Sequence, residues 1–254
     1  MLATGDLTVE GRVVTASNLT LYARIDTDGG SIPCVYKPIA GERPLWDFPT
    51  GTLAARERVA YLVSEAGGWA LIPPTVVRDG PLGPGMCQRW VTDDDSTGWA
   101  AVVAVEAGVP DGWRAVLTGR DETGQPVHLV HRDDDRLRSL AVLDAVLNNA
   151  DRKGGHLLTG HGGRLWAVDH GLCCHAEPKL RTVLWGWAGE PLGPTELGRL
   201  HRLEQWTAEA GTVLSGLLTE QECAALADRV RGLCDHGRLP HPDPGRPVIP
   251  WPAF

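Results

Sequence analysis

The sequence predicts an α+β fold with two lobes, a small β-rich lobe at residues 1–91 and a mainly helical lobe at residues 92–254. Two observations favour this division. Short segments with strand-like alternation fill the first third of the chain, whereas apolar residues at helical spacing dominate the rest. The acidic loop TDDDSTG follows Val91 and marks the point where we expect the chain to leave the first lobe. A chain of 254 residues is long enough to bury a real core.

Composition and charge exclude several classes of protein. Hydrophobic residues make up 43% and charged residues 22%, as in an ordinary soluble globular protein. A net charge of -8 gives no global attraction for nucleic acid or for an anionic membrane surface. The N-terminal sequence lacks a signal-peptide pattern and no apolar run is long enough to span a membrane, so we expect a cytoplasmic protein. The 6 cysteines are scattered without a C-x-x-C pair, which indicates reduced thiols.

The first lobe should contain three strands, a helix and two further strands. The first strands are expected at LTVEGRV, SNLTLYARI and SIPCVYKPI, with Asp28, Gly29 and Gly30 as the turn between the last two. The segment TLAARERVAYLVSEAGG carries helix formers and ends in glycines, as a helix does. The remaining strands, LIPPTVVRDG and GMCQRWV, are joined by GPLGPG, which is a turn and not a phosphate-binding loop because neither a helix N-terminus nor a lysine follows it.

The second lobe should begin with a hairpin, WRAVLTGRDETGQPVHLVH, which turns around Glu122 to Gln125. The run HRDDDRLRSLAVLDAVLNNA starts acidic and becomes apolar at helical spacing, so it predicts a buried helix with acids at its N-terminal end. A second hairpin, HLLTGHGGRLWAVD, follows it. Two helices are expected at about Thr195 to Ser215 and Thr219 to Cys234, and the proline-rich tail HPDPGRPVIPWPAF should not be helical.

The loop after the buried helix, in LNNADRKGGHLL, concentrates more charge than a simple connection needs. Asp151 stands at its start, His156 begins the second hairpin and Asp169 ends it, and a hairpin brings its two ends together. The three residues would provide a carboxylate base beside a nitrogen and an oxygen ligand for a divalent metal. Phosphoryl transfer needs this set, because its catalysis consists mainly of positioning and of neutralising charge.

Phosphoryl transfer also requires a cation for the non-transferred phosphates, held by an acid. Lys37 ends the third strand, in CVYKP, and is one of 3 lysines in the chain. Glu57 lies in the next helix on the same face as Ala60 and Ser64, so its side chain can turn inward. Glu65, near the end of that helix, is the alternative partner. We therefore predict a Lys37–Glu57 ion pair.

The order of these motifs resembles that of a known kinase family. VYKP, an acid-bearing helix, GMCQRWV, NNADRKGGHLL and VDHG follow one another as in the phosphatidylinositol 3- and 4-kinase-related branch of the protein-kinase-like fold. The likeness is greatest to small bacterial, mainly actinobacterial, proteins of this branch, and GERPLWDFP and RTVLWGWAGEPL also look typical of them. HipA-type and actin-fragmin kinases are more distant. The resemblance spans Gly11 to Gly171.

The resemblance implies an ATP-dependent phosphotransferase with an alcohol group as acceptor, using ATP and Mg²⁺ or Mn²⁺. It assigns Asp151 as the catalytic-loop aspartate and Asp169 as the metal-binding aspartate, here in D-H-G. The other roles that it implies are phosphate contact for Lys37, ion pairing for Glu57, adenine binding by the backbone of Gln88, Arg89, Trp90 and Val91, and a position over the phosphates for Ser17 and Asn18. His156 replaces the family's asparagine, and because histidine suits Mg²⁺ less well than an amide oxygen, we expect Mn²⁺ to support activity better. The GxGxxG loop of ordinary protein kinases is absent.

Several residues allow more than one interpretation. Arg152 and Lys153 either contact substrate phosphate or are merely exposed, and Lys153 is the better candidate for stabilising transition-state charge. Asn148 and Asn149 should fix the helix end and the loop by hydrogen bonds. The sequence His131-Arg132-Asp133 imitates a kinase motif but should be a helix-capping acid run, because Arg138 stands where a metal ligand is needed. Trp46, Trp185 and Trp187 are the tryptophans that we consider as candidates for ligand contact.

Three functional alternatives remain open. A zinc site could use the histidines and cysteines between His156 and His175, but their spacing is poor and structural cysteines explain them better. A pseudokinase would bind nucleotide and act by protein docking, and the third alternative is adenylyl transfer. For a kinase, we expect a protein hydroxyl or a small soluble alcohol as the acceptor, without nucleic acid and without stable membrane association.

Overall fold

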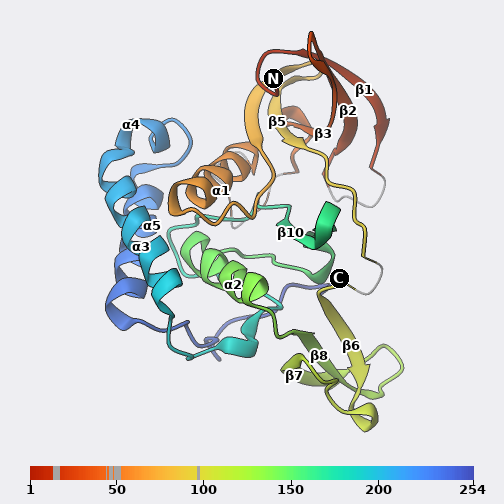
Figure 1. Cartoon of the computed structure of the whole chain (residues 1–254), viewed down its shortest axis with the longest axis vertical. Coiled ribbons are helices and arrows are strands. Elements are labelled where there is room, and N and C mark those ends of the chain that lie inside the picture. Colours follow the sequence, from red (N-terminus) through yellow and green to blue (C-terminus); the bar gives the residue numbers. More distant parts are fainter. Residues whose placement is uncertain (14–17, 44, 46–47, 49–52, 96–97) are drawn as a thin grey trace.

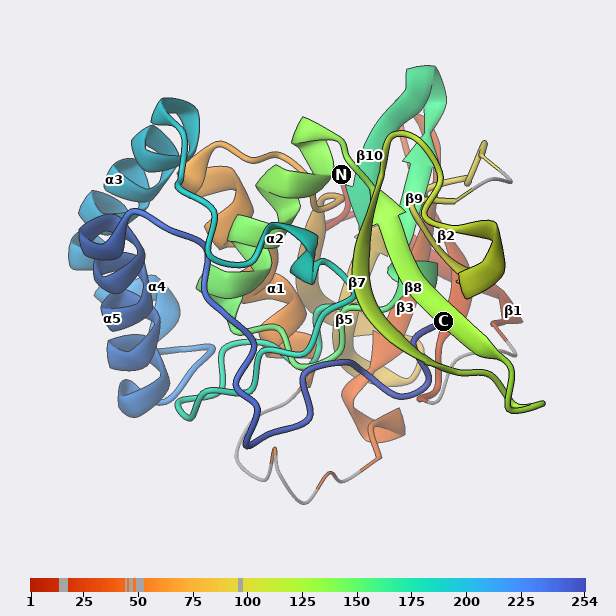
Figure 2. The same cartoon turned by 90° about the horizontal axis from the view of Figure 1, so that it is seen from below.

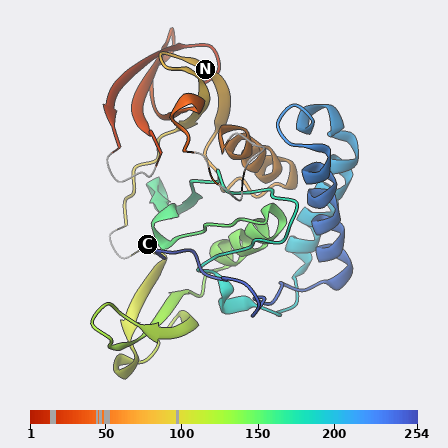
Figure 3. The ribbon, with the colours of Figure 1, turned by 180° about the vertical axis from the view of Figure 1, so that it is seen from behind.

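The computed structural model describes residues 1–13, 18–43, 45, 48, 53–95 and 98–254. It is a mixed α/β structure with a sheet-rich N-terminal part and a C-terminal part that holds most of the helices (Figure 1). Seen from behind in Figure 3, the N-terminal sheet lies at one end of the molecule and a second, smaller sheet at the other, with a helix and a hairpin between them. The mixed class expected from the sequence is confirmed. Ser17 and Trp46 lie outside the described residues.

The N-terminal sheet has five antiparallel strands in the order β1-β2-β3-β5-β4. Their bounds are Asp6–Arg12 (β1), Leu21–Thr27 (β2), Gly30–Pro38 (β3), Thr75–Gly80 (β4) and Gly83–Arg89 (β5). Alternate residues of β2 are buried, as the sequence pattern predicts for a strand with one covered face. Gly30 has φ +119 at the predicted turn between β2 and β3, a conformation that favours glycine. All five predicted strands are confirmed.

Helix α1, Leu53–Gly67, packs beside this sheet and closes the N-terminal part. Its first free amides, those of Leu53 and Ala54, donate to the carboxylate of Glu42 at 2.9 Å each, so a residue from the preceding segment caps the helix. The helix ends at Gly67, and Gly68 follows with φ +78. Glu57 lies on the buried face, as predicted.

Helix α2, Asp135–Leu147, is the buried helix that leads into the candidate site. The side chain of Asp134 caps its N-terminus by accepting from the Arg136 amide, which confirms the predicted acidic start. Helices α3 (Pro194–Glu209), α4 (Gly211–Leu214) and α5 (Glu220–His236) form a layer on one side of α1 and α2 (Figure 2). Residues 237–254 contain neither a helix nor a strand, as their prolines predict.

The C-terminal part also contains two small sheets. Strands β6 (Ala100–Ala104), β7 (Trp113–Arg120) and β8 (Pro126–Arg132) form one sheet in the order β6-β8-β7, and β9 (Leu157–Gly160) pairs with β10 (Arg164–Ala167). Both predicted hairpins are therefore confirmed. Strand β6 was not predicted, because its short run of alanine and valine has no polar alternation to distinguish a strand from a helix. Short 3₁₀ helices occupy Ile39–Gly41, Val105–Ala107, Gly154–His156, His161–Gly163 and Trp185–Trp187.

The main hydrophobic core surrounds α2 and takes side chains from α1, α3, α5 and the β9–β10 hairpin. Because α1 belongs to the N-terminal part, this core joins the two parts of the chain. A smaller cluster, which includes Tyr36 and Cys87, covers the other face of the N-terminal sheet. All 6 cysteines are free, which confirms the reduced thiols expected from the sequence. No described helix is both long and apolar enough to cross a bilayer.

Candidate active site

The loop between α2 and β9 is fixed by the two asparagines at its start. Asn148 ends α2 in the left-handed conformation, with φ 51, and its side chain donates to the carbonyls of His175 and Glu177. The Asn149 Oδ1 atom accepts from the Asp151 amide at 3.0 Å. The prediction that these residues fix the helix end and the loop is confirmed, and their contacts orient the Asp151 backbone.

The β9–β10 hairpin brings His156 and Asp169 together across the site. The Val168 amide donates to the His156 carbonyl at 3.0 Å, so the two ends of the hairpin remain paired beyond the strands. The His156 Nε2 atom lies 3.4 Å from Asp169 Oδ2. Asp169 has φ 60, which few residues other than glycine adopt. This turn of the backbone places its carboxylate at the end of the hairpin.

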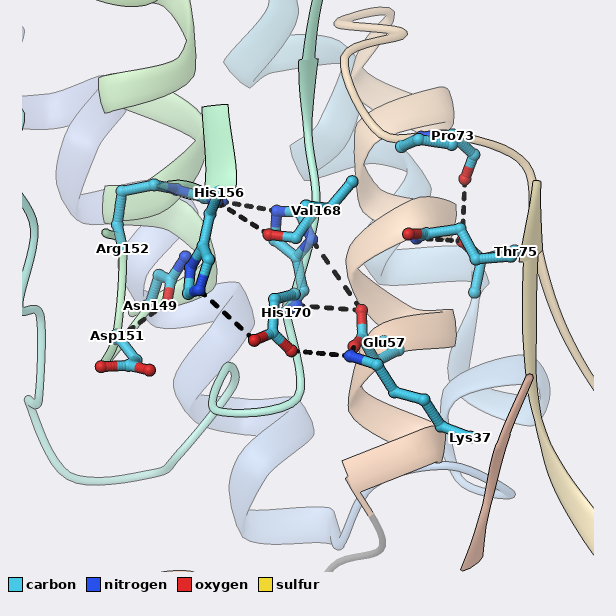
Figure 4. Close-up of polar contacts among 12 residues, drawn as sticks. Lys37, Glu57, Pro73, Thr75, Asn149, Asp151, Arg152, His156, Val168 and His170 are labelled. Atoms are coloured by element: carbon cyan, nitrogen blue, oxygen red, sulfur yellow. Dashed lines mark hydrogen bonds and ion pairs between the residues drawn. The ribbon is translucent and has the colours of Figure 1, made fainter. Parts of the chain in front are cut away.

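Lys37 connects Glu57 with Asp169 (Figure 4). Its Nζ atom lies 2.8 Å from Glu57 Oε1 and 2.7 Å from Asp169 Oδ1. Burial by itself would lower the Lys37 pKa, but the charges of Asp169 and Glu57 outweigh it and raise the pKa above its usual value. The Lys37 ammonium in turn holds the pKa of Asp169 well below its usual range. Lys37 and Asp169 are therefore charged at neutral pH, whereas burial raises the pKa of Glu57 against the opposing effect of the Lys37 charge.

Asp151 and Lys153 form a second pair on the other side of His156. The Lys153 Nζ atom lies 3.7 Å from Asp151 Oδ2, and both side chains are partly exposed. Burial raises the pKa of Asp151 to about 6, against the opposing effect of Lys153. In Figure 4 the Asp151 carboxylate points away from the Lys37–Glu57 pair. A carboxylate with this pKa can accept a proton near neutral pH.

Asp169 and His156 are the two residues that could hold a divalent metal together with phosphate oxygens and water, the usual pattern for Mg²⁺. Burial lowers the pKa of His156 to about 4, so the ring is neutral at pH 7. Its Nδ1 accepts from the Lys153 amide at 3.4 Å, which puts the ring proton on Nε2, facing Asp169. A metal on Nε2 therefore requires the proton to move to Nδ1. The two side chains supply only part of the ligands of a divalent cation, so water or oxygens of a bound ligand would have to supply the rest.

The zinc alternative has no site in the part of the chain that the structure describes, where no three His, Cys, Asp or Glu side chains are arranged to hold a metal. Cys173 and Cys174 are both completely buried in the main core. Their role is therefore the structural one expected from the sequence.

Arg152 neither is exposed nor is available for substrate phosphate, so both interpretations considered for it are wrong. Its side chain is completely buried and binds Asp144 through two nitrogens at 2.9 Å each. It also donates to the Val168 carbonyl at 3.0 Å and to His170 Nε2 at 2.6 Å. Arginine is the usual choice for such a buried, bidentate pair with a carboxylate. The sequence contained one signal for this, an acid on the buried face of an otherwise apolar helix.

The segment expected to bind adenine lies where β5 leaves the sheet. The Gln88 side chain donates to Thr75 Oγ1 at 2.8 Å and is buried. The amides of Arg89 and Trp90 donate to Pro74 and Pro33, at 2.9 and 3.0 Å. The Gln88 side chain and the Arg89 and Trp90 amides therefore already donate hydrogen bonds within the N-terminal part. A nucleotide would have to use other groups, and the next amide along the chain is that of Val91.

The loop expected over the phosphates is described only from Asn18 onward, whose Oδ1 accepts from the Arg43 amide at 3.0 Å. Trp187 is buried and donates to Asp133 Oδ1 at 3.1 Å, while Trp185 donates to the Val248 carbonyl at 2.8 Å. His131 is buried and accepts from the Gly186 amide at 3.0 Å. The residues from His131 to Asp133 therefore have a structural role, as predicted, but His131 and Arg132 end β8, and the residue that caps α2 is Asp134 and not Asp133.

One contact of the candidate catalytic loop had no signal in the sequence. The last residues of the chain reach this loop, where the Gly154 amide donates to the Ala253 carbonyl at 2.8 Å. The Phe254 ring lies directly against Gly154, with its nearest two carbons 2.2 and 2.4 Å from the position that a Cβ would take. In Figure 3 the C-terminus lies at one side of the molecule, at a height between the N-terminal sheet and the small sheet at the other end.

No known protein-family model matches the chain. It is 49% identical over 266 residues to Protein Rv2133c of Mycobacterium tuberculosis, an alignment that covers 100% of this chain and 94% of the relative. The chain belongs to the Rv2133c family. Among solved structures, this member of the Rv2133c family is similar to the crystal structure of a Helicobacter pylori proinflammatory kinase, CtkA, with a TM-score of 0.48, 10% sequence identity and coverage of 94% of both chains.

Proposed function

We propose that this protein is an ATP-dependent phosphotransferase of the kinase type, which transfers the γ-phosphate of ATP to a hydroxyl group. The observation that supports this most is the contact of Lys37 with both Glu57 and Asp169, at 2.8 and 2.7 Å, opposite Asp151. These four residues come from four separate segments, and phosphoryl transfer requires side chains of these types. The motif order that resembles phosphatidylinositol 3- and 4-kinase-related proteins supports the same assignment.

In this proposal, ATP binds between the two lobes and its non-transferred phosphates contact Lys37. Glu57 is 1% exposed and cannot follow the ligand, so its role is to hold the Lys37 ammonium in place. Preorganised charge of this kind lowers the barrier because it needs no rearrangement during the reaction. Adenine would lie against the segment from Gln88 to Val91, and the loop at Ser17 and Asn18 would cover the phosphates.

Asp151 is the base that takes the proton of the acceptor hydroxyl, or orients it, and Lys153 offsets the charge that develops on the phosphoryl oxygens. Because its pKa is about 6, Asp151 is mostly deprotonated at pH 7. The same pKa makes it a stronger base than an ordinary aspartate, so it can share a proton with the acceptor. A divalent cation, when bound through Asp169 and His156, would supply neutralisation of the phosphate charge. Asp169 is 49% exposed in its side chain, which leaves it accessible to a ligand.

The acceptor in this proposal is a protein hydroxyl or a small soluble alcohol. The net charge of -8 does not favour residence on anionic lipids or binding to nucleic acid. Stable membrane association and a nucleic-acid partner are therefore not part of the proposal.

The test is incubation of the purified protein with γ-labelled ATP, with Mg²⁺ and Mn²⁺ in parallel, following ADP release and label transfer. Asp169→Ala should abolish ADP release. The control is His161→Ala, which changes an exposed residue at the turn of the same hairpin and should leave the rate unchanged. ADP release that persists in an Asp151→Asn, Asp169→Asn double variant would refute the proposal.

A nucleotide-binding pseudokinase is the second candidate, and one observation favours it. The His156 N–H faces Asp169, so the pair is arranged as a hydrogen bond and not as an open metal site. This candidate predicts ATP binding by equilibrium dialysis without ADP release in either metal. Label incorporated from the α-phosphate, and not from the γ-phosphate, would instead indicate adenylyl transfer.

A further inference from the structure

A buried chain of polar contacts lies behind the candidate site, and of its members only Glu57 has a role in the proposed chemistry. It runs from Asp144 on α2 through Arg152 and His170 to Glu57 on α1. Asp144, Arg152 and His170 are each 0% exposed, and Glu57 is 1% exposed. A buried polar network of this length is costly unless its members are paired, so its presence calls for a reason.

The direction of each hydrogen bond can be assigned from the chemistry of the groups. Arginine can only donate, so His170 Nε2 accepts from Arg152 Nη2 at 2.6 Å and the ring proton lies on Nδ1. The His170 amide donates to Glu57 Oε2 at 2.9 Å, and the Nδ1 atom lies 4.0 Å from the same oxygen. Among the described residues, Nδ1 has no hydrogen-bond partner. An inward movement of α1 by about 1 Å would allow Nδ1–H to bind Glu57 as well.

The positions of these residues in the chain give the network its significance. Arg152 directly follows Asp151, and His170 directly follows Asp169. The Arg152–His170 bond therefore ties the backbone beside one candidate catalytic carboxylate to the backbone beside the other. The bond from His170 to Glu57 then connects both to Lys37, since Glu57 Oε1 accepts from Lys37 Nζ at 2.8 Å.

We propose that His170 is a positioning residue: it fixes Asp151, Asp169 and the Glu57–Lys37 pair relative to one another. This rests on the proposed function. Phenylalanine, the residue usual at the middle of the D-F-G motif, could fill the space but would offer no acceptor to Arg152. In His170→Phe, Arg152 Nη2 would donate to Asp144 alone. The side-chain hydrogen bond that connects this position to the catalytic loop would be lost.

The experiment compares His170→Gln with His170→Phe. Glutamine can place its Oε1 atom about where Nε2 of histidine lies, so it keeps the acceptor for Arg152, whereas phenylalanine removes it. We expect His170→Phe to lower kcat/KM on the order of 100-fold, with a rise in KM for ATP, because small displacements of catalytic groups cost this much. His170→Gln should stay within about 5-fold of the parent protein, a rescue that only the retained hydrogen bond explains.

The matched control is His131→Phe, which removes another buried histidine with a backbone partner far from the network. It should lower thermal stability without changing KM for ATP. Hydrogen exchange of the α1 peptide, Leu53–Gly67, provides a readout that does not depend on activity. Exchange should increase in His170→Phe but not in His170→Gln or His131→Phe.

The two readouts, activity and hydrogen exchange of α1, test the proposed function and this inference separately. If the parent protein releases no ADP, the kinase proposal fails, and the exchange of α1 alone decides whether His170 positions Glu57. Equal losses of activity in the glutamine and phenylalanine variants, with unchanged exchange of α1, would overturn the inference while leaving the kinase assignment intact.

Discussion

Lys37 Nζ lies 2.7 Å from Asp169 Oδ1, although 132 residues separate the two in the chain. Lys37 stands near the end of β3 and Asp169 follows β10, so this contact joins the N-terminal sheet to the β9–β10 hairpin. The same ammonium binds Glu57, whose side chain is buried. One lysine thus pairs with two carboxylates from different parts of the fold.

Replacement of Lys37 by methionine should abolish ADP release and also destabilise the fold. The change leaves the buried Glu57 carboxylate without its cation, which costs about 2 kcal/mol, less than for a fully buried pair because Lys37 is partly exposed. Urea unfolding of Lys37→Met measures this loss. A Lys37→Met, Glu57→Gln double variant also removes the charge of Glu57. It should recover much of the stability but none of the activity. Equal stability of the single variant and the parent would contradict the expected pairing.

The rate of ADP release should increase with pH between about 5 and 7. The active form of Asp151 is the deprotonated one, and its pKa of about 6 in the folded protein sets the midpoint. Steady-state kcat/KM across this pH range tests the expectation. Lys153→Met removes the neighbouring cation, so it should move the midpoint upward, by at most about 1 pH unit for a partly exposed pair. A midpoint that stays fixed in this variant would argue against Asp151 as the titrating group.

The fold should lose stability below about pH 6.5 because three histidines are buried in the neutral form. Burial lowers the pKa of His131 and His156 to about 4 each and that of His170 well below its usual value. Below pH 6.5 the unfolded chain binds protons that the native protein does not, so stability falls as the pH falls toward 4. His131 and His156 each contribute about 2 kcal/mol to the loss at pH 5, and His170 acts in the same direction.

His131→Phe provides the test of this pH dependence. The variant lacks one of the titrating groups, so its unfolding free energy should fall by about 2 kcal/mol less than that of the parent between pH 7 and pH 5. Urea unfolding at the two pH values measures the difference. The same pH dependence in both proteins would show that His131 is not neutral and buried in the native state.

Gly154→Ala should destabilise the protein, while Gly155→Ala should not. A Cβ at Gly154 would lie 2.2 Å from the Phe254 ring, whereas one at Gly155 meets nothing within 4 Å. Displacement of Phe254, or overpacking against it, costs about 1–3 kcal/mol. Thermal melting compares the two variants, and limited proteolysis reports whether the segment from Val248 to Phe254 has been released. Phe254→Ala combined with Gly154→Ala should restore the parent melting temperature, and failure to do so would locate the strain elsewhere.

Much of the secondary structure could be predicted from the sequence, because the signals are local. The glycine turn between β2 and β3, the acids before α2 and the glycines after α1 each mark an element by the chemistry of a few adjacent residues. Strand β6 was missed for the same reason, since Ala100–Ala104 carries no such mark. The inward position of Glu57 followed from the spacing of residues on one helix.

What the sequence by itself determined was the set of chemical groups and their order: a lysine on a strand, an acid on the next helix, and two acids and a histidine around a hairpin. The sequence also predicted the Lys37–Glu57 pair and the approach of His156 to Asp169, whereas only the tertiary structure decided that Lys37 contacts Asp169 as well and what the arginine beside them does. Arg152 looked like a surface cation because sequence shows charge but not burial. In the fold Arg152 is buried together with Asp144, which lies 8 residues earlier in the chain. A carboxylate on the buried face of α2 is stable only when a cation pairs with it, and Arg152 is that cation.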